Sequence, residues 1–222
     1  MHLVILFEDN HVIAVDKPAG VLVQGDHTHD PTLVARVRAH LKLRYAKPGN
    51  VYVGIVHRLD RPVSGAVVFA RTSKAAARLS ASFRNGKVEK TYNALVERVP
   101  EPTSGVLEHF LLKDTEHNRS RVVAAGTPGA RRARLHYQVL ERIGTRALVE
   151  VHPETGRSHQ IRVQLAAIGA VIVGDVRYGS PTPLRPMLAL HASRLRLPHP
   201  TRDEIIDIRS PLPQSWVAWF GR

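Results

Sequence analysis

The order of apolar and polar positions along the chain predicts mostly short β-strands joined by tight turns. Apolar residues fill most of positions 3–7 and 12–15 on either side of Asp9, a residue type that tolerates turn geometry, and this pattern predicts a β-hairpin. The segments 134–143 and 146–151 predict a second hairpin around an intervening glycine. Because consecutive strands with short connections pair antiparallel, the sheet should be mainly antiparallel.

Apolar side chains at helical spacing predict three helices. The first carries interleaved apolar and basic residues, which gives it a basic outer face; the apolar ones are Leu33, Val34, Val37 and Leu41, and the basic ones are Arg36, Arg38, Lys42 and Arg44. The second begins after Thr72 or Ser73 as its N-cap and ends at Gly86. The third follows Ser158, which the sequence predicts as its N-cap.

Together these elements predict an α+β fold with a curved, mainly antiparallel central sheet flanked by helices. No linker, repeat or low-complexity segment divides the chain, so we expect a single domain over residues 1–222. No apolar run approaches the ~20 residues of a membrane helix. The apolar start of the chain lacks a basic lead, so we expect no signal peptide and a cytoplasmic location.

The composition is strongly basic and free of cysteine. Lysine and arginine number 32 against 19 aspartate and glutamate residues, which gives a net charge of +13 at pH 7 and a pI near 10.8. This balance favours nucleic acid as a partner, although ribosome-bound and membrane-surface proteins share it. The absence of cysteine excludes disulfides, thiolate nucleophiles and cysteine-based zinc or iron–sulfur sites.

The segment 57–65, which reads His-Arg-Leu-Asp-Arg-Pro-Val-Ser-Gly, places a carboxylate in a cationic turn between two apolar runs. The flanking segments 51–56 and 66–70 predict buried strands, so Asp60 should lie on a loop held by a rigid sheet. Arginines on both sides favour its ionised form, which suits a nucleophile better than a general acid. A structural ion pair that ties the turn is the alternative interpretation.

This segment resembles the H-R-L-D-x-x-T-S-G signature of the RluA-type pseudouridine synthases, with Val63 where that family usually has threonine. Further blocks similar to the same family follow in the same order, at residues 9–20, 90–92, 155–162, 172–179 and 190–192. The resemblance therefore covers most of the chain. It implies the pseudouridine synthase fold and the isomerisation of specific uridines to pseudouridine in structured RNA, with no cofactor.

The resemblance also implies roles for individual residues. Asp60 would be the catalytic aspartate, Arg157 would pair with it, and Tyr92 would be the active-site tyrosine. Without the resemblance, spacing favours Tyr92 as a core aromatic and leaves Arg157 as a solvated or phosphate-binding side chain. Arg58 would fill the gap left when the target nucleotide leaves its stack. The other candidate RNA contacts are Lys17, Lys90, Arg162 and Leu190.

Other functions agree less well with the sequence. A kinase catalytic loop also begins with His-Arg, but its aspartate follows directly and a Gly-rich phosphate loop accompanies it. The 13 histidines include no His-Glu-x-x-His, so we expect no metal. A glycoside hydrolase would need a second carboxylate opposite Asp60. The remaining alternative is a catalytically silent RNA-binding or ribosome-assembly factor on the same fold.

The resemblance leaves the RNA target open between ribosomal and transfer RNA. Since the sequence begins with the block that resembles the family's opening hairpin, we expect no separate N-terminal RNA-binding domain. We also expect a monomer whose own loops choose the target. The segments without a clear family match are the candidates for that choice, at residues 25–48 and 113–134.

Overall fold

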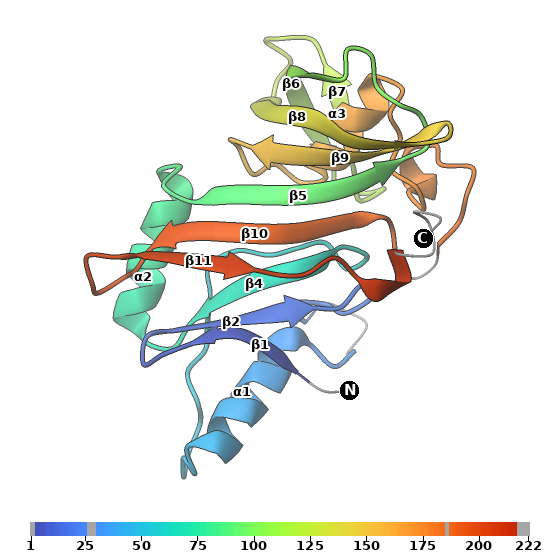
Figure 1. Ribbon diagram of the computed structural model, residues 1–222. Coiled ribbons are helices and arrows are strands. Elements are labelled where there is room, and N and C mark those ends of the chain that lie inside the picture. Colours follow the sequence, from blue (N-terminus) through green and yellow to red (C-terminus); the bar gives the residue numbers. More distant parts are fainter. Residues whose placement is uncertain (1–2, 26–29, 185–186, 217–222) are drawn as a thin grey trace. The chain divides into compact units, whose positions relative to one another are not determined.

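The computed structural model describes residues 3–25, 30–184 and 187–216. The chain forms two compact units, of which unit 1 comprises Met1–Glu89 with Ala192–Leu212 and unit 2 comprises Lys90–His191 with Pro213–Arg222. The described residues form both α-helices and antiparallel β-strands, which confirms the predicted α+β class (Figure 1). The expected single domain over residues 1–222 stays a prediction.

Unit 1 contains a sheet whose strands are β1 Val4–Glu8, β2 Val12–Lys17, β3 Gly54–Ile55, β4 Ser64–Ala70, β10 Leu190–Pro198 and β11 Ile205–Arg209, where β10 belongs to unit 1 from residue 192 onward. The strand order is β1-β2-β4-β10, with β3 paired to β4 and β11 paired to β10. The predicted hairpin of β1 and β2 is confirmed. Its turn is closed by Asp9 Oδ1, which accepts hydrogen bonds from the backbone N–H groups of His11 (2.8 Å) and Val12 (2.7 Å).

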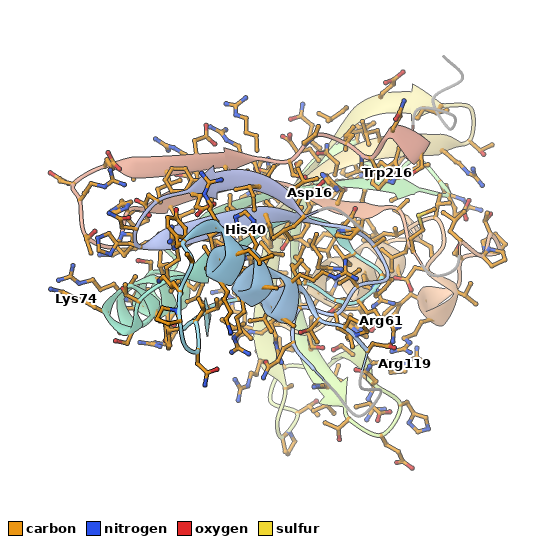
Figure 2. All side chains as sticks on the ribbon, turned by 90° about the horizontal axis from the view of Figure 1, so that it is seen from below. Asp16, His40, Arg61, Lys74, Arg119 and Trp216 are labelled. Atoms are coloured by element: carbon orange, nitrogen blue, oxygen red, sulfur yellow. The ribbon has the colours of Figure 1, made fainter. Side chains whose placement is uncertain are left out.

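Two helices of unit 1 match the predicted ones, α1 Leu33–Arg44 and α2 Ser73–Arg84. Each begins after a threonine N-cap. The hydroxyl of Thr32 accepts the backbone N–H of Ala35 in α1, and the hydroxyl of Thr72 accepts the backbone N–H of Ala75 in α2. Helix α2 buries Ala75 and Leu79 in the core that β2 and β4 contribute to. Figure 2 shows α1 in front of β1 and β2, and His40 Nε2 on this helix lies 3.2 Å from Glu8 Oε2 at the end of β1.

One predicted strand of unit 1 is shorter than expected. The apolar run at residues 51–56 predicts a full strand, but only β3 pairs with β4, through Gly54 opposite Ala70 and Ile55 opposite Phe69. Residues 51–53 have no ladder partner among the described residues. Val51 and Val53 are nevertheless buried, at 9% and 5% exposure, because alternating side chains still point into the core.

Unit 2 contains an antiparallel sheet of five strands among the described residues: β5 Glu89–Val96, β6 Ser104–Asp114, β7 Arg119–Val123, β8 Arg131–Ile143 and β9 Arg146–Pro153. Their order is β5-β9-β8-β6-β7 (Figure 1). The predicted hairpin of β8 and β9 is confirmed, with Gly144 in its turn at a φ of +60°. The mainly antiparallel pairing expected from short connections is therefore present in both units.

Helix α3, Gln160–Ala167, lies on one face of the unit 2 sheet, where Val163 packs with Leu111 and Ala133. The prediction of Ser158 as its N-cap is wrong. The helix begins one residue later, after His159, which adopts a left-handed φ of 54° and makes no side-chain capping bond. The Ser158 carbonyl instead accepts a 2.7 Å hydrogen bond from Ser120 Oγ, so the turn before α3 is held by β7.

Candidate active site

Asp60 lies on the short loop between β3 and β4 in unit 1, and this loop is bonded to the loop that follows β2. The backbone N–H of Gly20 donates to the Arg61 carbonyl at 2.8 Å, and Arg61 Nε donates to the Gly20 carbonyl at 3.0 Å. Arg61 also pairs with Asp30 at 2.7 Å. The reciprocal bonds fix the peptide that immediately follows the half-buried Asp60.

The Asp60 turn closes through backbone alone. Val63, which stands where the resembled family usually has threonine, is 3% exposed and donates its N–H to the Asp60 carbonyl at 3.1 Å. A threonine hydroxyl is therefore unnecessary for closing this turn. The apolar side chain of Val63 contributes burial where a hydroxyl would have needed its own hydrogen bond.

Lys17 is fully buried, and its ammonium group anchors both loops. Its Nζ donates to the carbonyls of Pro18 (3.1 Å), Val21 (2.8 Å) and Arg61 (3.0 Å), which uses all three N–H groups of a lysine. Burial lowers the pKa of Lys17 from 10.5 to about 7, although the carboxylates of Asp60 and Asp16 oppose that shift. The expectation that Lys17 contacts RNA is therefore wrong, because no donor remains for a phosphate.

His57 and Arg58 begin the same loop and point to different environments. His57 Nε2 accepts the backbone N–H of Val68 at 3.0 Å, and the imidazole stacks on Phe83 of α2 at a ring distance of 4.6 Å. This fixes the loop to β4 and to α2. Arg58 is exposed, and its guanidinium makes no hydrogen bond or ion pair with the described residues.

Gly65 ends the Asp60 loop at a point where two strands approach closely. Its φ is +116°, and a Cβ placed on it would lie 2.3 Å from the backbone oxygen of Ala192 in β10. Only glycine permits this backbone conformation together with this approach. The Ser64-Gly65 pair of the sequence block therefore has a structural cause, since it lets β4 leave the loop beside β10.

In unit 2, β5 carries Lys90 and Tyr92 on one face of the strand, since side chains two residues apart point the same way. Tyr92 lies opposite Val151 of β9 and is half-buried. Lys90 Nζ donates to the carbonyl of Thr155 at 3.3 Å, and burial lowers the pKa of Lys90. Strand β5 is thereby tied to the turn that carries Arg157.

The turn that carries Arg157 is organised by Gln160, which is buried at 4% exposure. Gln160 Oε1 accepts from the backbone N–H of Arg157 (3.0 Å) and from the Thr155 hydroxyl (2.7 Å), and its Nε2 donates to the Arg134 carbonyl (3.0 Å). Arg157 Nε donates to the Arg132 carbonyl at 3.0 Å. These contacts give Gln160 the supporting, non-catalytic place at the Arg157 turn that the sequence suggests for it, and its signal is a polar side chain at the start of an otherwise apolar helix.

Arg162 lies in a buried network five residues beyond Arg157. Its Nε and Nη2 donate to both carboxylate oxygens of Asp175 at 2.7 Å, and its guanidinium lies 5.2 Å from the centre of the Tyr178 ring. The Tyr178 hydroxyl accepts the Ser120 N–H at 2.8 Å and contacts His159 Nδ1 at 3.0 Å. Asp175 and Tyr178 belong to the 172–179 block, so this network connects that block to the helix that follows the Arg157 turn.

The predicted site residues are divided between the units. Unit 1 holds Asp60, Arg58 and Lys17, and unit 2 holds the rest, which are Tyr92, Lys90, Arg157, Arg162 and Leu190. Arg162 and Leu190 are 5% and 3% exposed. Their assignment as RNA contacts, like that of Lys90 and Arg58, stays a prediction. The pairing of Arg157 with Asp60 also stays a prediction.

Two further features of the described residues bear on the chemistry. No group of three or more His, Cys, Asp or Glu side chains in residues 3–25, 30–184 and 187–216 is arranged to hold a metal ion. None of the helices within these ranges is long and apolar enough to cross a membrane.

Comparison with known proteins identifies the family. Residues 11–167, more than half of the chain, match the family model of RNA pseudouridylate synthases. The chain is 36% identical over 215 residues to an uncharacterized RNA pseudouridine synthase of Bacillus subtilis, YhcT, with 94% of this chain and 68% of the relative covered. It is 39% identical over 227 residues to ribosomal large subunit pseudouridine synthase D of Nitrosomonas europaea, with 97% and 64% covered.

Other relatives are similar over more than nine tenths of their length. An uncharacterized RNA pseudouridine synthase of Zymomonas mobilis is 36% identical over 216 residues, with 96% of this chain and 95% of the relative covered. Among solved structures, human RNA pseudouridylate synthase domain containing 4 superposes with a TM-score of 0.83 at 26% identity, with 98% of this chain and 92% of that chain covered. The chain therefore belongs to the family of RNA pseudouridylate synthases, which are isomerases that act on RNA.

Proposed function

We propose that this pseudouridine synthase uses Asp60 as its nucleophile to isomerise specific uridines in structured RNA. The observation that carries the proposal is the anchoring of the Asp60 loop by Lys17 and Gly20, which holds a carboxylate on a short rigid connection. Catalysis gains from a reacting group held in one geometry. A catalytically silent RNA-binding protein would have no use for a carboxylate beside the RNA phosphates, which it repels.

In the proposed reaction, the carboxylate of Asp60 adds to ribose C1′ or to the uracil ring, and the N1–C1′ bond breaks. The uracil turns while enclosed, C5 bonds to C1′, the bond to Asp60 breaks, and the C5 proton moves to solvent as N1 gains a proton. Substrate and product are isomers, so the reaction has no net oxidation, reduction or group transfer that would need a cofactor. Water must stay out, because its attack at C1′ would release free uracil.

Tyr92 is proposed to stack on the uracil and to help remove the C5 proton. An aromatic ring on a strand is a common platform for an unstacked base. An unperturbed phenol has a pKa of about 10, so the principal role proposed for Tyr92 is stacking, and proton transfer follows only where the site favours the phenolate. Tyr92→Phe should therefore keep RNA binding and lose part of kcat, whereas Tyr92→Ala should lose both.

Arg157 is proposed to orient Asp60. In support, Gln160 and Lys90 fix its turn, and Arg157 uses only Nε, so its terminal nitrogens have no partner among the described residues. Arg162 lies on the same segment, and its Nε and Nη2 donate to Asp175.

The test of this assignment compares Arg157→Lys with Arg162→Lys. We expect Arg157→Lys to lower kcat by about 10²-fold at an unchanged Tm, because lysine cannot reproduce a bidentate pair. Arg162→Lys should lower Tm by several degrees through loss of the Asp175 pair. A normal kcat in Arg157→Lys, with a kcat loss at unchanged Tm in Arg162→Lys, would move the role to Arg162.

We propose ribosomal RNA as the substrate, with the cytoplasm as the location and a monomer as the active form. Two relatives carry the name ribosomal large subunit pseudouridine synthase D, and a net charge of +13 suits a large polyanion. Transfer RNA is the alternative target. Mapping of pseudouridine in total RNA from a deletion strain and its parent distinguishes the two targets.

The decisive experiment is tritium release from unmodified cellular RNA labelled at uracil C5, because forming the C5–C1′ bond expels that hydrogen. Wild type should release tritium, Asp60→Asn should release none while still binding RNA, and Asp203→Asn, an exposed aspartate in the β10–β11 turn, should behave as wild type. No release by wild type from RNA that it binds would support the assembly-factor alternative.

A further inference from the structure

Three cations on and just after helix α1 have none of the roles assigned above. Between Asp30 and Asp60 the chain contains no aspartate or glutamate but six lysine and arginine residues, at positions 36, 38, 42, 44, 47 and 58. Figure 2 shows α1 at the front of unit 1, with its outer side turned toward the viewer. Three of the six side chains are exposed there and make no hydrogen bond or ion pair with the described residues: Arg38, Lys42 and Lys47.

The carboxylate of Glu8, at the end of β1, is already engaged by the other side of α1. The Glu8 side chain is 9% exposed, and it accepts hydrogen bonds from the Tyr45 hydroxyl at 2.7 Å and from Arg71 Nη1 at 3.2 Å. His40 Nε2 and Arg44 Nε lie 3.2 Å and 3.6 Å from its oxygens. A carboxylate offers about four acceptor positions, so these partners fill Glu8.

Arg38 and Lys42 lie on a different side of the helix. Each precedes one of the Glu8 partners His40 and Arg44 by two residues, which turns it by about 160° around the helix axis. Residues four apart are neighbours on a helix, so the two cations adjoin and repel each other. The helix dipole favours cations in the last turn, which contains Lys42, but Arg38 lies in the middle of α1. An unbalanced pair of cations on a fixed helix indicates an anionic partner.

The outer side of α1 suits the phosphate backbone of an RNA duplex better than a single strand. Single-strand sites combine cations with aromatic rings on which bases stack. Tyr45, an exposed aromatic residue just after the helix, is bonded to Glu8 and has the Arg71 guanidinium over its ring at 4.5 Å. A stem is recognised mainly by its shape and phosphates, and small side chains between cations let its backbone approach. Such an arrangement is present in the exposed series Ala35, Arg38, Ala39 and Lys42.

Helix α1 begins beside the Asp60 loop and extends away from it. Asp30, three residues before the helix, pairs with Arg61 at 2.7 Å, and the first N–H groups of the helix donate to carbonyls of the loop that follows β2. The other end of the helix reaches Glu8, at the turn of the β1–β2 hairpin. Its 12 residues span about 18 Å, or about half of the 34–36 Å turn of a duplex. A stem next to a uridine at Asp60 can therefore follow α1.

We propose that the outer side of α1 binds the phosphate backbone of an RNA stem that adjoins the target uridine, through Arg38 and Lys42, with Lys47 beyond the end of the helix. The inference rests on the proposed function, and it names the part of the substrate that unit 1 holds away from the reacting base. Phosphates carry no sequence information. The choice of RNA should therefore depend on the presence of the stem and not on the sequence of that stem.

The test measures the salt dependence of RNA binding for wild type and for the double variant Arg38→Gln/Lys42→Gln, which keeps good helix formers at both positions. The probe is a hairpin RNA that wild type modifies in its loop. Loss of two phosphate contacts should weaken binding roughly 3- to 30-fold at about 50 mM salt and reduce the slope of log affinity against log salt by about 1.8. At saturating RNA, kcat should stay unchanged, because neither side chain belongs to the proposed catalytic groups.

The matched control is Lys74→Gln/Arg84→Gln, which removes the same charge from exposed positions of α2 in the same unit. It should keep the affinity and the slope of wild type. Both double variants should keep the wild-type Tm, because all four side chains are exposed. An equal fall in slope for the two double variants would reveal a general effect of net charge and overturn the inference.

A second RNA separates the stem from the single strand. On the excised loop, which carries the same uridine without the stem, wild type and Arg38→Gln/Lys42→Gln should bind alike. Equal weakening on the hairpin and on the excised loop would assign this side of α1 to a single strand and overturn the inference, as would an unchanged slope on the hairpin. Absence of pseudouridine in every RNA, including one that wild type binds with full salt dependence, would instead overturn the proposed function itself.

Discussion

The ammonium group of Lys17 donates a 3.0 Å hydrogen bond to the carbonyl of Arg61, the residue that follows Asp60. The two residues are 44 positions apart in the sequence, and both belong to unit 1. The same ammonium holds the carbonyls of Pro18 and Val21. A single buried side chain therefore joins the loop after β2 to the loop of the proposed nucleophile.

Replacement of Lys17 should affect stability and catalysis together. Lys17→Met keeps the length of the side chain but removes a donor from three carbonyls, of which only that of Arg61 keeps a second bond among the described residues, from the Gly20 N–H. Each acceptor left unsatisfied costs about 1–3 kcal/mol before relaxation. We expect a loss of about 2–4 kcal/mol in urea unfolding and a roughly 10- to 100-fold lower kcat from the displaced carboxylate. Lys87→Met, at an exposed lysine after α2, is the control and should change neither quantity.

The depressed pKa of Lys17 predicts a pH dependence of stability. Burial lowers this pKa from 10.5 to about 7, so between pH 7 and 10 the unfolded chain holds a proton that the folded chain has released. Stability rises with pH where the unfolded state binds more protons, so wild type should gain roughly 4 kcal/mol over Lys17→Met across this interval. Below pH 7 both states are protonated and the difference should be flat.

Urea unfolding of both proteins at pH 6, 8 and 9.5 measures this effect. Other titrating groups cancel in the difference between the two proteins, because only residue 17 changes. A difference that is constant from pH 6 to 9.5, or that shrinks as the pH rises, would show that Lys17 stays protonated in the folded chain.

Gly65 should tolerate no side chain. At a φ of +116°, an added Cβ would meet the backbone oxygen of Ala192 at 2.3 Å, so β4 and β10 would have to separate. We expect Gly65→Ala to cost about 3 kcal/mol or more and to abolish activity. Gly86→Ala, at a φ of +68° with nothing within 4 Å, separates backbone strain from the clash and should cost only about 1 kcal/mol. Equal losses in thermal unfolding would rule out the close approach as the cause.

Gln160 should act on catalysis through the Arg157 turn. Gln160→Leu removes the acceptor for the Arg157 N–H and the donor to the Arg134 carbonyl, so the turn loses its fixed geometry. We expect kcat to fall by about 10- to 100-fold with little change in KM. Gln160→Glu keeps the acceptor and should retain more activity than the leucine variant. A higher KM at a normal kcat would contradict a positioning role.

Much of the fold follows from local pattern. The alternation around Asp9 and around Gly144 predicts both hairpins, and the apolar spacing with Thr72 predicts α2, because these signals involve neighbours in the sequence. The segment 51–53 and Ser158 show where local pattern fails. Strand pairing depends on a partner that the segment does not contain, and the start of α3 depends on the left-handed backbone of His159.

The chemistry-bearing residue types and their order can be read from the sequence: the Asp60 loop with Gly65, Tyr92 on a strand, and arginines near the start of a helix. The contacts of each side chain depend on how the chain folds. From the sequence, Lys17 is expected to be a solvated surface cation. In the structure it is buried and anchors two loops, because its three acceptors come from loops that only folding brings together. Arg162 and Asp175 form a buried pair for the same reason, since their 13-residue separation carries no local signal. Local periodicity encodes which face of an element is buried, whereas hydrogen bonds between distant loops depend on the assembled chain.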